Sequence, residues 1–82
     1  MMMKEIFKTL RTLISEQTGI EETQVKPASH FADDLNLEPL EISDLLLSVE
    51  EKFGLDNLGV RPDDVETVAD LVNIISDKQN EI

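Results

Sequence analysis

Residues 39–54, which read PLEISDLLLSVEEKFG, decide the fold of this chain. Their apolar side chains recur every three or four positions, as they do on one face of an α-helix. Pro39 suits the first helical position because its missing N–H would have no partner there. Gly54 favours a helix stop, because glycine adopts the left-handed conformation without strain. We therefore predict a helix over residues 39–53 with one buried face: Ile42, Leu45, Leu46, Val49 and Phe53.

The same periodicity predicts helices on either side of this stretch. Residues 4–18 carry an apolar stripe and precede Gly19, and residues 68–76 carry another after Thr67, with Asp70 placed for a capping box. A short helical turn is expected over residues 62–65. We predict an all-α fold, a small four-helix bundle of three longer helices and one short one. Residues 1–82 form a single domain, with a tail frayed from about residue 77 because the apolar stripe ends there.

Residues 20–36 show no regular period and predict a long first loop. Loops of this length in small domains are held down by a few apolar anchors or serve a function. Val25, Phe31 and Leu35 are the candidate anchors. We expect this loop to wrap around the bundle.

Composition narrows the class of function. The chain has 82 residues, no cysteine, and 18 acidic against 7 basic side chains, for a net charge of −11. Such a charge repels nucleic acid and anionic membranes and attracts basic proteins. The apolar runs are too short to span a membrane. We expect a monomer in the cytoplasm with basic protein partners; which of the three opening methionines initiates translation stays open.

The sequence contains no pattern that is typical of a catalytic, calcium-binding or phosphate-binding site. His30 is the only histidine, and its neighbour Ser29 is too close along the chain to be placed for proton transfer. A calcium loop starting at Asp34 would need glycine where Pro39 stands and glutamate where Leu45 stands. The three glycines are isolated, so no phosphate loop is present. We predict no enzyme and no metal site.

Several motifs nevertheless follow one another in a familiar order. Phe31-Ala-Asp-Asp-Leu35, then Leu40-Glu41, then Glu50-Glu51-Lys52-Phe53-Gly54 resemble the centre of acyl carrier proteins. Residues 19–25 resemble the first loop of that family, and residues 67–72 resemble its last helix. The resemblance covers nearly the whole chain. It implies a four-helix carrier fold and partners among acyl-transfer or acyl-synthesis enzymes.

The resemblance fails at one residue. The family attaches phosphopantetheine to the serine of a D-S-L motif, and counting from both flanking motifs places that serine at residue 39. This chain has Glu38-Pro39-Leu40 there, and proline has no hydroxyl. We therefore predict no cofactor. Ser43 lies one turn further along, but its use would shift both flanking motifs by four residues. Attachment of 4′-phosphopantetheine to Ser43 is kept as the alternative, and an ordinary helix serine is the preferred interpretation.

The family's docking surface does carry over. The resemblance implies acidic partner-binding residues at Glu38, Glu41, Asp44 and Glu51 and apolar ones at Leu40 and Leu47. The alternative for Leu47 is that it widens the buried face. Three functions remain: a carrier-like domain that docks basic partners without an arm, a working carrier in fatty-acid or polyketide-type synthesis, and a plain acidic interaction domain.

Overall fold

The structure, a computed structural model, describes residues 2–80 and consists of helices joined by ordered loops. Three α-helices, α1 (Met3–Thr18), α2 (Pro39–Phe53) and α3 (Val68–Gln79), are accompanied by two 3₁₀ turns, η1 (Glu22–Gln24) and η2 (Pro62–Asp64). The all-α prediction is confirmed, and η2 is the predicted short helix. We did not predict η1, because a single 3₁₀ turn has no apolar period to reveal it.

The helix ends lie where local chemistry places them. Pro39 is the first residue of α2, and Gly19 and Gly54 follow α1 and α2 with φ angles of +82° and +66°. Thr67 caps α3, since its hydroxyl accepts a hydrogen bond from the Asp70 N–H at 3.2 Å. The predicted bounds of α2 are therefore confirmed at both ends.

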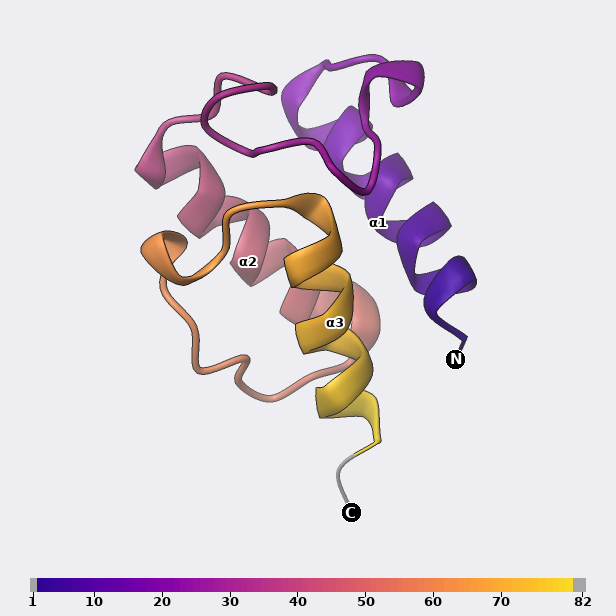
Figure 1. Ribbon diagram of the computed structural model, residues 1–82. Coiled ribbons are helices and arrows are strands. Elements are labelled where there is room, and N and C mark those ends of the chain that lie inside the picture. The colour runs from indigo at the N-terminus through magenta and orange to yellow at the C-terminus, as the bar shows by residue number, and fades with distance from the viewer. Residues whose placement is uncertain (1, 81–82) are drawn as a thin grey trace.

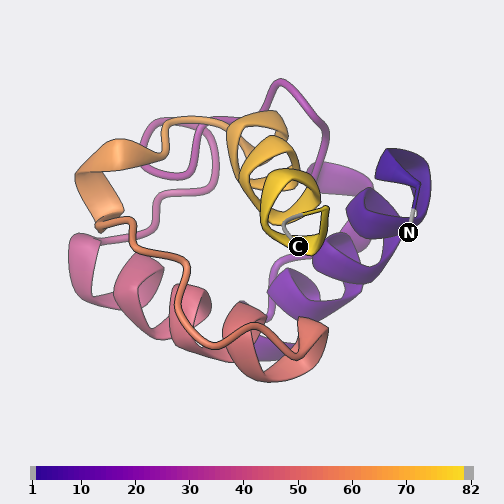
Figure 2. The same ribbon diagram turned by 90° about the horizontal axis from the view of Figure 1, so that it is seen from below.

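The helices bury one continuous core. α1 packs against α3, and α2 closes the other side of the bundle, as the views in Figures 1 and 2 show. The connection after α2, orange in both figures, returns to η2, which packs beside α2. The core side chains are Ile6, Leu10, Ile14, Val25, Phe31, Leu35, Leu37, Ile42, Leu45, Leu46, Val49, Leu58, Val65, Val68, Leu71, Val72 and Ile75.

The long first loop is tied to the start of α3. The N–H of Phe31 donates to the carbonyl of Glu66 at 2.9 Å, and the N–H of Val68 donates to the carbonyl of Ser29 at 3.0 Å. These bonds flank an isolated antiparallel bridge between His30 and Thr67. The predicted anchors Val25, Phe31 and Leu35 are all buried. The loop therefore wraps the bundle and fixes the approach to α2.

The end of α3 differs from our prediction. We expected fraying from about residue 77, but the helix continues through Gln79. Backbone hydrogen bonds continue past the last core side chain, and Lys78 in the last turn complements the negative end of the helix dipole. Glu81, which we also placed in the frayed tail, and Met1 lie outside the described residues.

Candidate docking face and prosthetic-group site

The exposed face of α2 presents two leucines to solvent. Leu40 is 73% exposed and Leu47 is 59% exposed, whereas the neighbouring Leu45 and Leu46 are buried. The alternative that Leu47 widens the core is thereby excluded. Single exposed leucines are common on proteins, but these two lie seven residues apart and therefore share one side of the helix.

Carboxylates surround the two leucines. The side chains of Glu38, Asp44 and Glu51 are exposed, and so is that of Glu41. One Glu41 oxygen accepts a hydrogen bond from the Glu38 N–H at 2.9 Å, which completes half of a capping box at the start of α2. The predicted partner-binding residues thus lie on α2 and on Glu38, its N-cap residue.

One acidic residue of α2 has a role that the sequence did not reveal. Glu50 is half-buried, and its Oε2 accepts a hydrogen bond from the Leu58 N–H at 2.8 Å. This bond ties the connection after α2 to the helix itself. The partner lies eight residues away across a loop, and no sequence pattern marks such a pair.

Residue 39 and Ser43 lie one turn apart on α2. Pro39 is exposed at the helix start, and Ser43 is half-buried. Since each residue turns an α-helix by about 100°, Ser43 points within about 40° of the direction of Pro39. Ser43 borders a hollow of about 390 Å³, which is lined by Ser43, Leu46, Leu47, Glu50, Asp56, Asn57, Leu58 and Val60.

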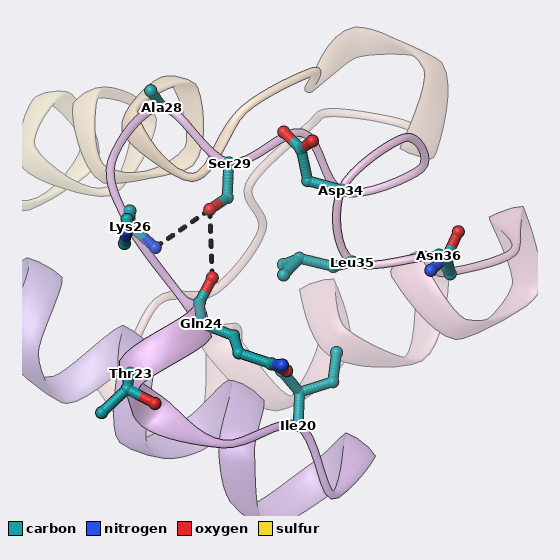
Figure 3. Close-up of a pocket in the computed structure, with 9 residues that line it drawn as sticks. All are labelled: Ile20, Thr23, Gln24, Lys26, Ala28, Ser29, Asp34, Leu35 and Asn36. Atoms are coloured by element: carbon teal, nitrogen blue, oxygen red, sulfur yellow. Dashed lines mark hydrogen bonds between the residues drawn. The ribbon is translucent and has the colours of Figure 1, made fainter.

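A second hollow, of about 660 Å³, lies in the first loop and is shown in Figure 3. None of the residues that line it is one of the predicted site residues. Ser29 lies at its wall, where the Ser29 hydroxyl accepts from the Lys26 N–H at 3.0 Å and donates to the Gln24 carbonyl at 3.2 Å. The Ser29 hydroxyl thus stabilises the loop, and we assign this hollow no chemistry.

The start of α3 holds a carboxylate with a shifted pKa. Asp70 Oδ2 accepts hydrogen bonds from the N–H groups of Thr67 and Glu66, both at 3.1 Å. These bonds, that from Thr67 foremost, lower the pKa of Asp70 below its ordinary value of 3.8 because they favour the charged form. The role is structural, since Asp70 holds the first turn of α3.

Among residues 2–80, no cluster of three or more histidine, cysteine, aspartate or glutamate side chains could hold a metal ion. Within the same residues, no helix combines the length and apolar character that crossing a membrane requires.

Comparisons with known proteins agree with one another. Residues 8–75 match the family of phosphopantetheine attachment sites. The chain is 34% identical over 70 residues to the acyl carrier protein of Clostridium acetobutylicum, covering 85% of this chain and 91% of that protein. The fold is similar to the solution structure of the apo doublet acyl carrier protein from prodigiosin biosynthesis, with a TM-score of 0.81 at 17% identity. That match covers 92% of this chain, which spans 36% of the doublet.

The family match corrects our prediction about the cofactor. We expected none, but acyl carrier proteins hold a 4′-phosphopantetheine group, and the matching family is defined by its attachment. The prediction of no cofactor was wrong because it extended the loss of one hydroxyl to the whole chain. Residue 39 itself does not fit the group, since a phosphate ester needs a side-chain hydroxyl and Pro39 has none.

Proposed function

Since this chain belongs to the acyl carrier protein family, we propose that it docks on basic surfaces of acyl-transfer or acyl-synthesis enzymes through α2. Domains of this family are carriers and not enzymes. The observation that carries the proposal is the exposure of Leu40 and Leu47 beside Asp44 and Glu51. Exposed apolar side chains inside a charged rim are typical of small contact centres. We further propose that the protein is a cytoplasmic monomer, because a net charge of −11 opposes self-association.

Charge reversal on α2 tests the docking proposal. The probe is a broad-specificity phosphopantetheinyl transferase without coenzyme A, added to ¹⁵N-labelled protein. We expect shift changes centred on α2, and at least about ten-fold weaker binding by the Asp44→Lys plus Glu51→Lys variant, because opposed like charges are costly. The matched control is Glu16→Lys plus Asp77→Lys. It changes the net charge by the same amount as the test variant, but its substitutions lie on α1 and α3. Equal weakening by both variants would contradict a specific docking face.

A second candidate concerns the prosthetic group, and it rests on Ser43. We propose that Ser43 is the attachment residue if this chain is a working carrier, because it is the hydroxyl on α2 that points most nearly as residue 39 does. In that step the Ser43 oxygen forms an ester bond to the pantetheine-bearing phosphate of coenzyme A. The bond between the two phosphates breaks, adenosine 3′,5′-bisphosphate leaves with the electron pair, and the hydroxyl proton passes to solvent.

Intact protein mass tests this candidate. The wild type, Pro39→Ser and Ser43→Ala are each incubated with coenzyme A, magnesium and the same transferase. If Ser43 is the site, the wild type gains the mass of one arm and Ser43→Ala does not. Pro39→Ser is the control for enzyme competence. A gain by Pro39→Ser alone would reject Ser43 as the site and would leave the docking proposal standing.

A further inference from the structure

An apolar hollow lies where α1, the first loop and α3 meet, on residues that docking through α2 does not use. Helices α1 and α3 run side by side there, as Figure 2 shows. The hollow has a volume of about 350 Å³, within the range of sites that bind apolar groups. Five of its lining side chains are apolar: Met3, Phe7, Pro27, Ala69 and Val72. It can therefore take up an apolar group of a ligand or partner.

The charge beside this hollow has the opposite sign to that of the whole molecule. Lys4 lines the hollow, and Lys8 follows one turn further along α1. Both side chains are exposed, and within residues 2–80 neither forms an ion pair or a side-chain hydrogen bond. No carboxylate is among the described residues that line it, whereas Glu50 and Asp56 line the hollow beside Ser43. In a chain of net charge −11, this is a local basic and apolar patch.

Phe7, which lines the hollow, is held by a neighbour on its own helix. The guanidinium carbon of Arg11 lies 5.4 Å from the centroid of the Phe7 ring, so a cation–π contact fixes the ring. Arg11 Nε in turn lies 3.4 Å from Glu22 Oε1, and this carboxylate offsets the charge of Arg11. Lys4 and Lys8 therefore carry the positive charge beside the hollow that has no counter-charge.

The side chains of α1 form two short rows here. Met3 and Phe7 make an apolar row, and its members stand four residues, or about 6 Å, apart along the helix axis. Lys4 and Lys8 make a basic row with the same spacing, about 100° further around the helix. Glu5 points about 160° away from Phe7 and so faces away from the hollow. A single anionic head group would meet one lysine, whereas two carboxylates four residues apart on a helix match both.

We propose that a second docking surface, the α1–α3 patch, binds a short acidic amphipathic helix of a partner protein; the patch consists of Met3, Lys4, Phe7, Lys8 and Ala69. The partner helix carries a leucine followed by a glutamate, and the same pair four residues later. Its leucines enter the hollow and its glutamates meet the two lysines. This inference goes beyond docking through α2 and does not depend on it, because the two surfaces lie on different helices.

A pair of peptides tests the occupant, added to the ¹⁵N-labelled full chain. One peptide is a helix of repeated Leu-Glu-Ala-Ala units, and the other has the same composition in shuffled order. Salt is set at 0.15 M, because a screening length of about 8 Å weakens the long-range repulsion from the net charge of −11 and leaves close contacts. We expect the ordered peptide to bind about five-fold more tightly and to shift the amides of residues 3–8 and 69–73. Equal affinity of the two peptides would overturn the proposal.

Substitutions on the patch test the two rows separately. We expect Lys4→Gln plus Lys8→Gln to bind the ordered peptide about five-fold more weakly, as for the loss of two exposed ion pairs. Met3→Ser should bind about three-fold more weakly, because it removes an exposed apolar side chain and leaves the core intact. The matched control for charge is Lys52→Gln plus Arg61→Gln, at the end of α2 and before η2. Equal weakening by the two double variants would contradict a specific site.

Other occupants and the α2 surface are separated by three further measurements. If decanoate shifts the same amides at least as strongly as the ordered peptide, the hollow takes a small anionic amphiphile and the partner helix is wrong. If these amides shift when the protein alone is concentrated, a second copy covers the patch and the proposal also fails. Affinity for the transferase should be the same in Lys4→Gln plus Lys8→Gln as in the wild type. A parallel loss of transferase binding would show that the patch is not a separate surface.

Discussion

At the scale of single residues, Asp70 shows how one carboxylate can hold the junction between two segments. Its Oδ2 accepts from the N–H groups of Glu66 and Thr67, just where the first loop is hydrogen-bonded to the start of α3. The neighbouring His30 lowers the pKa of Asp70 further, though less than the backbone bonds do. The charged form of Asp70 is therefore the form that stabilises the native fold.

Replacement of this carboxylate gives a stability loss that depends on pH. We expect Asp70→Asn to lower the free energy of unfolding by about 1 kcal/mol at pH 7. Because the folded pKa lies below the ordinary value of 3.8, the contribution of Asp70 is full above that value. It is lost as the pH falls through the folded pKa. Urea unfolding at pH 7, 5 and 3 should show the difference between wild type and variant shrinking at pH 3, and a constant difference would contradict the assignment.

At the scale of elements, α2 packs one face against the core and exposes the opposite face to solvent. Leu45 is fully buried, whereas Leu47, two residues later, is 59% exposed. The acidic side chains along α2 do not all have the same role. Glu41 caps the first turn and Glu50 anchors the following connection, so only part of the acidic pattern is left for a partner to explain.

Two leucine-to-alanine variants separate these faces. We expect Leu45→Ala to lower the free energy of unfolding by about 2–5 kcal/mol, because it leaves a cavity in the core. Leu47→Ala should change it by less than about 0.5 kcal/mol, as for an exposed site. Leu47→Ala should instead weaken binding to the transferase. Thermal unfolding followed by circular dichroism gives the first comparison, and a large loss for Leu47→Ala would show that this side chain supports the fold.

At the scale of the whole molecule, like charges are crowded into a small volume. The full chain carries a net charge of −11, and the fold measures only 35 × 23 × 19 Å. Several carboxylates accept hydrogen bonds from backbone N–H groups, as Asp34 does from His30 and Asp64 does from Arg61. These hydrogen bonds therefore stabilise the turns, but they do not remove the repulsion between the carboxylates.

Salt should consequently stabilise this protein. The screening length falls from about 30 Å at 0.01 M salt to about 10 Å at 0.1 M, which is shorter than the smallest extent of the molecule, 19 Å. We expect the melting temperature to rise by about 3–6 °C over this range, equivalent to somewhat less than 1 kcal/mol. Differential scanning calorimetry in sodium chloride provides the measurement. A melting temperature that does not respond would mean that the charges are too well spread to repel one another.

The helices of this chain follow from local patterns in its sequence, whereas the docking residues on α2 stay a prediction. Apolar periodicity, Pro39 and Gly54 set the bounds of α2, because helix starts and stops are decided by residues next to them. The Thr67 cap of α3 and the loop anchors Val25 and Phe31 were found in the same way. From the sequence we also placed the family's attachment position at Pro39, but that placement did not justify excluding the cofactor, and the family match corrected the exclusion.

Only the folded arrangement shows which carboxylates of α2 accept hydrogen bonds from the rest of the chain. The bond from Leu58 to Glu50 joins residues separated by a loop, and the exposure of Leu47 depends on where the neighbouring elements stop covering α2. Likewise, the first loop is fixed through its bonds to the start of α3. Such contacts form between segments that are distant along the chain, so no local sequence pattern contains them.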